Sequence, residues 1–249
     1  MNEKPCPLDA GTLERIESLI SEMTLDEKLG MLHGDNVYDT KGVERLGIPP
    51  FRFSDGPMGV RGEFDRETCG YVEHTDDLAT SFPCITAVAA TWNPDMAYEN
   101  GKALGREVRG RGKDVSLSPG INIHRTPLCG RNFEYMSEDP YLISKMCVAE
   151  IKGIQENDIA ACIKHFAANN QETRRYDVNV EVDERALHEL YLPGFQAAVQ
   201  EGGCLAIMGA YNQFRGEYCC QNQYLMKNLL RDQWGFDGIV ISDWGAVHD

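Results

Sequence analysis

Residues 236–248 read FDGIVISDWGAVH, and this segment indicates how the chain folds. The apolar run of residues 238–241 is typical of a strand that is buried on both faces, as in a parallel sheet. The run stops at Ser242, and Asp243 follows. A lone carboxylate at that point would cost a large free energy to bury unless its charge were used. We therefore expect Asp243 to be a functional group at the end of a buried strand.

Strand and helix signals alternate through the rest of the chain, as in proteins built on a parallel sheet. The expected strands cover residues 51–53, 115–117, 159–163, 204–208 and 238–241, with a candidate sixth strand over residues 82–88. The expected helices cover residues 12–32, 93–110, 138–156, 183–199 and 224–233. The first has a capping-box pattern at residues 24–27, where it is expected to break and restart. The fourth is expected to kink at Pro193.

Chemically capable side chains gather directly after the expected strands. The strand ends lead into Asp55, Pro119, His165, Tyr211 and Asp243. A TIM-like (β/α)8-type barrel places its active site at that face, whereas a doubly wound sheet concentrates its chemistry at one switch point. We therefore predict an α/β fold of the barrel type. A complete barrel has eight strands and typically ~250 residues, so one or two closing strands are expected to be missing.

The amino-acid composition limits the kinds of protein that this chain can be. The chain has 249 residues, of which 42% are hydrophobic and 25% are charged, so it can bury a sizeable core. Its net charge of −15 argues against nucleic acid and against an anionic membrane surface as partners. Nine cysteines without a CxxC pair suit a reducing compartment, and Cys162 and Cys204 are expected in the core. With neither a signal peptide nor a membrane span in view, we expect a cytoplasmic protein.

Several catalytic motifs do not occur in the sequence. His188-Glu189 is not followed by a second histidine at the spacing of an HExxH zinc site. The stretch 105–113 does not fit a phosphate-binding loop, and no GxSxG elbow is present. We therefore expect no metal and no cofactor. A carboxylate at Asp243 beside the indole of Trp244, among hydrogen-bonding side chains, suits carbohydrate chemistry.

The polar clusters each have a structural alternative. The segment 164–172, which begins Lys164-His165, suits binding of sugar hydroxyls but is also compatible with a solvated loop. Arg131 is equally compatible with a surface position and a ligand-binding one. By itself, Asp55 favours a turn, and Tyr211 is typical of a half-buried packing residue. Glu138 and Asp139 are expected to cap a helix.

Seven short motifs occur in a fixed order. They are Ser54-Asp55-Gly56-Pro57, Gly130-Arg131-Asn132-Phe133-Glu134, Ser137-Glu138-Asp139-Pro140, Lys164-His165-Phe166, Asn169-Asn170-Gln171-Glu172, Tyr211-Asn212 and Ser242-Asp243-Trp244. Together they resemble the N-terminal barrel of glycoside hydrolase family 3, in its β-glucosidase branch. The resemblance runs from about Leu25 to Val247.

The resemblance implies a retaining mechanism in which Asp243 is the nucleophile and forms a covalent glycosyl-enzyme. Asp55 matches the carboxylate that holds hydroxyls on the far side of the non-reducing sugar. The other sugar-binding residues that the resemblance implies are Arg131, Lys164, His165, Arg175, Tyr211 and Trp244. Of these, Tyr211 is expected beside the nucleophile, and Trp244 is expected to form an aromatic wall. Family spacing favours Arg175 over its neighbour Arg174, and Arg61 is a further candidate. Charged donors near Asp243 are expected to keep it ionised.

Two departures from family patterns matter. The N-acetylglucosaminidase branch carries a second histidine after the Lys-His-Phe motif, and this chain continues with alanine and asparagine instead. In the glucosidase branch the acid/base glutamate lies in a later α/β sandwich domain, which this sequence does not contain. Glu134 and Glu172 are conceivable substitutes. We therefore expect residues 1–249 to form a single, incomplete barrel domain, with little or no turnover by itself.

The expected activity is hydrolysis of terminal β-D-glucosyl residues from β-glucosides or short β-glucans. Small carbohydrates are accordingly the expected binding partners. A β-xylosidase of the same family is one alternative. The other is a sugar-binding remnant without catalysis, because the acid/base domain is missing.

Overall fold

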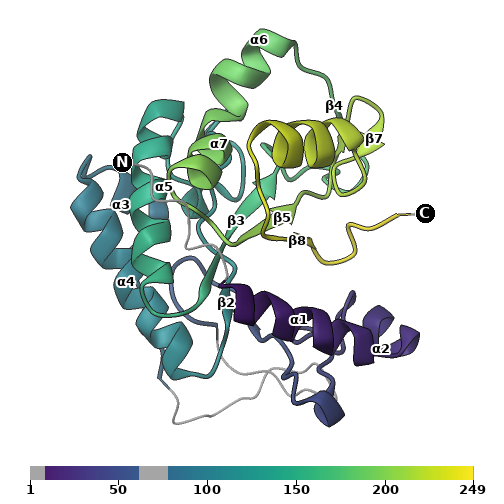
Figure 1. The fold of residues 1–249 in the computed structure, drawn as a ribbon. Helices are drawn as coiled ribbons and strands as arrows, with labels where there is room; N and C mark the ends of the chain where they lie inside the picture. The colour runs from purple at the N-terminus through teal and green to yellow at the C-terminus, as the bar shows by residue number, and fades with distance from the viewer. Residues whose placement is uncertain (1–8, 62–77, 249) are drawn as a thin grey trace.

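The computed structural model describes residues 9–61 and 78–248 (Figure 1). Its centre is a five-stranded parallel sheet in the order β1-β2-β3-β5-β8. The strands are β1 (Phe53–Ser54), β2 (Val115–Ser116), β3 (Ala160–Phe166), β5 (Ala206–Gly209) and β8 (Ile239–Ser242). This order follows the chain without the reversal that creates the switch point of a doubly wound sheet. The sheet is a curled half-barrel, which confirms the predicted (β/α) barrel architecture.

Helices cover the outer face of the sheet. They are α3 (Ile85–Ala89), α4 (Pro94–Gly110), α5 (Pro140–Gln155), α7 (Pro193–Gln200) and the π-helix η4 (Tyr224–Gln233). Figure 1 shows α4 and α5 side by side on the left, with α7 beside the upper part of α5. Gly153 allows this close packing, since an added Cβ would lie 2.1 Å from the carbonyl oxygen of Tyr98. Apolar side chains from these helices and the sheet form the main core.

The inner face of the sheet carries a second, smaller apolar cluster. Its buried members are Val115, Leu117, Cys162, Ala206 and Met208. Their neighbours along the strands, such as Ala161, Ile163 and Ile207, belong to the main core between the sheet and the helices. Because neighbouring residues of a strand face opposite sides, both faces of the central strands are apolar. This is the pattern that the continuous apolar runs predicted.

Two sequence predictions are wrong. Residues 82–88 do not form a strand, because α3 occupies most of this segment. Its buried residues Ile85, Val88 and Ala89 have helical spacing, so the run buries one helix face rather than two strand faces. Strand β8 is not buried on both faces, since Ile239 is 47% exposed. The reason is that β8 lies at the edge of the described sheet and pairs with β5.

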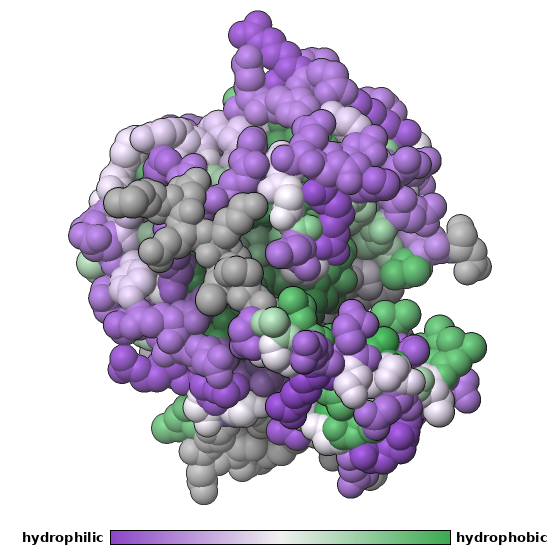
Figure 2. All heavy atoms as spheres, viewed as in Figure 1, coloured by the Kyte–Doolittle hydropathy of each residue, from purple (hydrophilic) through white to green (hydrophobic). Residues whose placement is uncertain are grey.

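The expected first helix divides as predicted into α1 (Ala10–Glu22) and α2 (Leu25–Gly30). Thr24 and Glu27 form the capping box between them. The apolar side chains of both helices are largely exposed, and Figure 2 shows them as green atoms at the lower right. Short 3₁₀ turns follow at η1 (Glu44–Leu46) and η2 (Asn132–Glu134).

The predicted kink at Pro193 is confirmed. Asp183 caps α6 (Glu184–Ala186), the π-turn η3 (Leu187–Tyr191) follows, and α7 begins at Pro193. A small second sheet contains β4 (Asn179–Val180), β6 (Gln213–Phe214) and β7 (Glu217–Tyr218). Asp139 caps α5 through the backbone N–H groups of residues 141 and 142, as expected.

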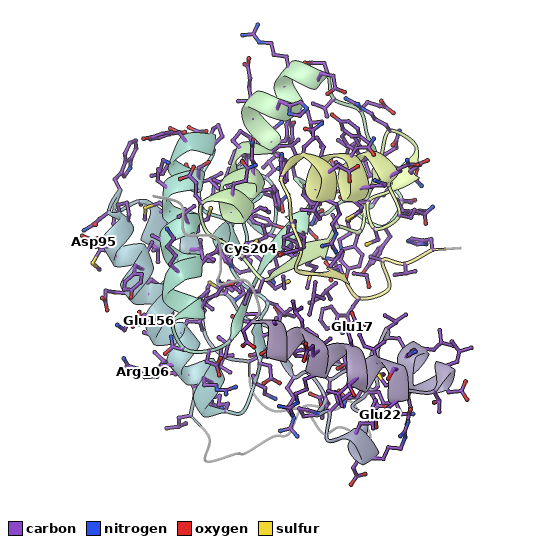
Figure 3. All side chains as sticks on the ribbon, viewed as in Figure 1. Glu17, Glu22, Asp95, Arg106, Glu156 and Cys204 are labelled. Carbon is purple, nitrogen blue, oxygen red and sulfur yellow. The ribbon has the colours of Figure 1, made fainter. Side chains whose placement is uncertain are left out.

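The cysteine expectation is confirmed where the structure describes it. Cys162 and Cys204 are buried and free, and Figure 3 places Cys204 inside the molecule near the start of β5. Cys6 and Cys69 lie outside the described residues. None of the described helices is long and apolar enough to span a bilayer.

Glu150 is a buried carboxyl on α5, away from the strand ends. It is fully buried, and Asn100 on α4 donates one hydrogen bond of 3.4 Å to its Oε1. Its Oε2 has no partner among the described residues. Burial raises the pKa of Glu150 to about 8, against a smaller opposing effect of Asn100. The folded protein therefore holds this side chain neutral over most of the physiological range.

This shift predicts a pH-dependent stability. Between its ordinary pKa of 4.5 and about 8, the folded state keeps the Glu150 proton while the unfolded chain releases it. The free energy of unfolding therefore falls as pH rises through this window. Glu150→Gln cannot ionise, so its stability relative to wild type should increase from about pH 5 to about pH 8 in urea unfolding. Glu17→Gln, on the exposed surface of α1 (Figure 3), is the control and should show no such trend.

Candidate active site

A pocket of about 220 Å³ lies at the C-terminal ends of the parallel strands. The residues that line it are Tyr38, Asp55, Arg61, Leu117, Arg131, Lys164, His165, Arg175, Met208, Tyr211, Asp243 and Trp244. The structure therefore brings together every residue that the sequence predicted for the site. Arg174 lies outside it, exposed and paired with Asp177, so the choice of Arg175 agrees with the geometry.

Lys164 links the two sides of the pocket floor. Its side chain is 3% exposed, and its ammonium group lies 3.0 Å from Asp55 Oδ1 and 3.6 Å from Glu134 Oε2. Arg61 binds the other oxygen of Asp55 at 3.0 Å. Burial opposes ionisation of Asp55, but Lys164, the backbone N–H of Gly56 and Arg61 together outweigh it, so the pKa of Asp55 lies below its ordinary value. Asp55 is thus more than a turn residue, because it is a charged carboxylate at the pocket wall.

His165 is held on every side. Asn122 accepts a hydrogen bond of 2.7 Å from the backbone N–H of His165 and donates one of 2.9 Å to its carbonyl. The ring lies between the Tyr135 hydroxyl, 2.8 Å from Nδ1, and Arg131 Nη2, 3.0 Å from Nε2. Glu134 accepts a hydrogen bond from Arg131 and orients it. Burial and then the charge of Arg131 hold the pKa of His165 well below 6.5, so the ring is neutral.

Asp243 follows directly after β8 and is 7% exposed. Its Oδ1 accepts a 2.8 Å hydrogen bond from the backbone N–H of Trp244. Its Oδ2 lies 3.4 Å from His165 Nε2 but has no hydrogen-bond partner among the described residues. Burial raises the pKa of Asp243, while the Trp244 N–H, Tyr211 and the charge of Arg131 lower it. The expected donors are present, but burial determines the direction of the net shift.

Tyr211 and Arg175 form a stacked pair at the pocket mouth. The Arg175 guanidinium lies 4.4 Å from the centroid of the Tyr211 ring, within the range of a cation–π contact. Glu172 accepts a 2.8 Å hydrogen bond from Arg175. Tyr176 packs against Tyr211 edge to face, with ring centroids 4.7 Å apart. The Tyr211 phenol therefore lies beside Asp243 in a fixed orientation rather than serving as a packing residue alone.

Trp244 forms a wall of the pocket together with the N-terminal segment. Its indole N–H donates a 2.9 Å hydrogen bond to the carbonyl of Val37, 207 residues earlier in the chain. The Tyr38 ring lies 5.4 Å from the indole, centroid to centroid. Asn36 fixes this turn by accepting hydrogen bonds from the backbone N–H groups of Tyr38 and Asp39, each 2.9 Å long. Contacts distant in sequence thus set the position of the wall.

Sequence reasoning missed several residues of the site. Tyr38, Leu117 and Met208 line the pocket. Tyr135 directly follows a quoted motif, and its position after Glu134 was an available signal for it. Leu117 and Met208 could have been inferred from strand alternation, whereas nothing in the sequence indicates Tyr38. Among the described residues, no group of three His, Cys, Asp or Glu side chains is arranged to hold a metal ion.

The pocket suits a small, uncharged molecule rich in hydroxyl groups. Its volume is below the range of ~300–1,000 Å³ that is usual for drug-sized ligands. Carboxylates accept hydrogen bonds, guanidinium and ammonium groups donate them, and neutral His165 can do either. The Trp244 and Tyr38 rings offer apolar faces beside these groups. The same pocket holds a buried carboxylate, Asp243, one oxygen of which accepts no well-formed hydrogen bond from the part of the chain that the structure describes.

Comparisons with known proteins agree with this geometry. The sequence profile of the glycosyl hydrolase family 3 N-terminal domain matches residues 24–249. Beta-glucosidase BoGH3A of Bacteroides ovatus is 49% identical over 235 residues, which are 94% of this chain and 32% of that protein. An exo-alpha-(1->6)-L-arabinopyranosidase of Bifidobacterium longum is 41% identical, over 92% of this chain and 30% of that protein.

The structure of this chain is also similar to solved structures. Beta-glucosidase 3B from Thermotoga neapolitana in complex with glucose superposes with a TM-score of 0.85 at 45% identity. The match covers 92% of this chain and 34% of that one. The chain therefore spans about a third of the length of the relatives that it matches.

The Lys164 ion pairs predict a specific stability defect. Lys164→Met would leave Asp55 and the buried Glu134 facing each other without their shared cation. Removing one partner of a buried pair costs roughly 3–5 kcal/mol, and we expect the lower end because Arg61 and Arg131 remain. The loss, measured by urea unfolding, should shrink at acid pH as Asp55, whose pKa Lys164 helps to lower, becomes protonated. Lys145→Met, which breaks the exposed pair with Glu201, is the control and should cost less than about 1 kcal/mol.

Proposed function

We propose, from the premise that this chain belongs to glycoside hydrolase family 3, that it carries the nucleophile and sugar-binding half of a retaining β-glucosidase. The substrate would be the terminal non-reducing glucosyl residue of a β-glucoside or short β-glucan. The relatives called beta-glucosidases and the glucose bound in a solved neighbour support the choice of sugar. We assign the catalytic role to Asp243 and the binding roles to the other polar residues of the pocket.

The observation that carries the proposal is the asymmetry of the Asp243 carboxylate. Oδ1 accepts the Trp244 N–H, whereas the buried Oδ2 accepts no well-formed hydrogen bond from the described residues, although the Tyr211 hydroxyl lies close to the carboxylate. A carboxylate oxygen without a hydrogen bond has a lone pair available for attack. In the first step Oδ2 forms a bond to the anomeric carbon, and the bond from that carbon to the aglycone oxygen breaks. The aglycone leaves with the electron pair, and water later cleaves the glycosyl-Asp243 ester.

The remaining polar residues suit the recognition of a single sugar ring. Asp55, held ionised by Lys164 and Arg61, offers acceptor lone pairs to hydroxyl groups. Arg131 and Arg175 offer donors from two other sides of the pocket. Acceptors and donors therefore surround the ring edge, while the Trp244 indole can cover an apolar face. Such a cage gives the binding energy that orients the anomeric carbon for attack.

The proton donor is the part of the mechanism that these residues do not supply. Asp55 has a lowered pKa, which makes it a poor acid. Glu134 binds Arg131 and Lys164, and Glu172 binds Arg175, so both carboxylates are engaged in ion pairs. Neither of them lines the pocket. We propose that the acid/base comes from outside residues 1–249, as the family resemblance implies.

A substrate that needs no acid tests the nucleophile directly. The dinitrophenolate of 2,4-dinitrophenyl 2-deoxy-2-fluoro-β-D-glucoside leaves without protonation, and the fluorine slows hydrolysis of the glycosyl-enzyme. The chain should therefore gain the mass of one fluoroglucosyl group, which peptide mapping should locate on Asp243. The label should persist in Glu134→Gln and be lost in Asp243→Asn, which keeps the size of the side chain. Labelling at another residue, or equal labelling of Asp243→Asn, would overturn the assignment.

A second candidate function follows from the arabinopyranosidase relative. A pentopyranoside lacks the C5 hydroxymethyl group of glucose, so the two sugars differ in one substituent and in ring stereochemistry. We expect 2,4-dinitrophenyl β-D-glucoside to release dinitrophenolate at least about tenfold faster than the β-D-xyloside or the α-L-arabinopyranoside, because one missing group in a fitted pocket costs roughly 1–3 kcal/mol. A preference for either pentoside would assign the corresponding activity instead.

A further inference from the structure

Tyr176 is an aromatic residue at the surface beside the pocket, in the loop between β3 and β4. Its side chain is 51% exposed and does not line the pocket, but it contacts two residues that do. The Tyr176 and Tyr211 rings meet edge to face, with centroids 4.7 Å apart. The Arg175 guanidinium lies 5.0 Å from the centroid of the Tyr176 ring. The proposed cage of sugar-binding residues leaves this ring without a role.

The loop holds the Tyr176 ring in a defined position. Arg175 donates a 3.0 Å hydrogen bond to the Tyr176 hydroxyl. Arg174 and Asp177, which flank this pair in the sequence, form an ion pair of 2.7 Å. The backbone N–H of Val178 donates to the carbonyl of Arg174, so a closed turn carries the ring. A ring that is already ordered loses little conformational entropy when a ligand covers it.

Side-chain contacts lead from Asp243 to Tyr176. The Tyr211 hydroxyl lies close to the Asp243 carboxylate. The ring of Tyr211 is buried, whereas that of Tyr176, which touches it, is half exposed. Tyr176 therefore lies on the solvent side of Tyr211, at the mouth of the pocket.

The geometry of the proposed reaction places the aglycone outside the pocket. The attacking carboxylate and the leaving oxygen lie on opposite faces of the anomeric carbon. Asp243 is buried, so it attacks from the inside and the aglycone extends toward solvent. The pocket itself measures about 220 Å³, which suits a single sugar ring. The first ring of the aglycone must then lie against side chains at the mouth, where Trp244 and Tyr176 are the exposed aromatic residues among those described.

We propose that Tyr176 binds the first ring of the aglycone, a role that rests on the glycosidase function proposed for this site. The ligand is a six-membered ring with a flat apolar face, either aryl or glucosyl, that is joined to the terminal sugar through the glycosidic oxygen. This face packs on the exposed part of the Tyr176 ring, where buried apolar surface and the aromatic contact stabilise binding. Arg175 occupies the pocket side of the same ring. Tyr176 thus favours substrates with a ring next to the scissile bond over those with a small alkyl group.

Ligands that do not react separate the aglycone contact from catalysis. Phenyl β-D-thioglucoside and methyl 4-thio-β-cellobioside carry a ring beyond the sulfur, whereas methyl β-D-thioglucoside carries one methyl group. NMR titration of the 249-residue chain gives the three dissociation constants. We expect at least one ring ligand to bind more tightly than the methyl ligand. Tyr176→Ala should weaken binding of that ring ligand by about threefold to tenfold, the factor that one aromatic contact is worth, and change that of the methyl ligand by less than about twofold.

Two further variants test whether the ring itself is responsible. Tyr176→Phe keeps the ring and removes only the hydroxyl that Arg175 binds, so it should retain most of the preference for the ring ligand. Tyr141→Ala is the matched control. Tyr141 is also an exposed tyrosine with a cation beside its ring, since Lys145 lies 5.6 Å from its centroid, but it does not line the pocket. This variant should bind all three ligands as wild type does.

The outcomes separate this inference from the proposed function. If neither ring ligand binds better than the methyl ligand, or if Tyr176→Ala weakens all three equally, the aglycone role is wrong while the sugar site stands. Equal weakening would mean that Tyr176 only supports Arg175 and Tyr211. If wild type binds none of the three ligands, the proposed sugar site fails as well. A loss confined to the phenyl ligand would assign aryl glucosides, and one confined to the cellobioside would assign short glucans.

Discussion

The ammonium group of Lys164 is the constraint on which the pocket depends. It lies on the inner face of β3 and is almost completely buried, where a lone charge would be very costly. Asp55, which follows β1, and Glu134, which follows β2, supply the compensating charges. The ion pairs therefore tie together the C-terminal ends of adjacent parallel strands. Arg131 enters this network through Glu134 and places its guanidinium against His165.

The polar strand ends could be predicted from sequence because parallel strands place their C-termini at one edge. Apolar runs that stop at Lys164, Tyr211 and Asp243 were enough to indicate that these side chains meet. Asp55 was ambiguous, since an aspartate before Gly-Pro is also an ordinary turn signal. Only the partner across the sheet distinguishes the two roles. That partner, Lys164, is 109 residues away in the chain.

Other features depended on information that a local pattern does not carry. The segment 85–89 is a short apolar run that fits either a strand or a helix, and packing against α4 and η2 decides for the helix. The exposure of Ile239 depends on which strand lies beside β8, not on the residues of β8. Tyr38 enters the pocket through a turn fixed by Asn36, and its contact with Trp244 joins opposite ends of the chain.

The same burial that makes Asp243 costly to ionise also makes it useful. Desolvation raises its pKa, which means that the ionised carboxylate has lost stabilising water. A carboxylate stabilised by few donors has more to gain from forming a bond to carbon. The protein limits the cost by placing Arg131 and Lys164 nearby rather than against Oδ2, the oxygen that we propose as the nucleophile. Charge at a distance keeps the anion accessible, whereas a direct donor on Oδ2 would occupy a lone pair that the proposed attack requires.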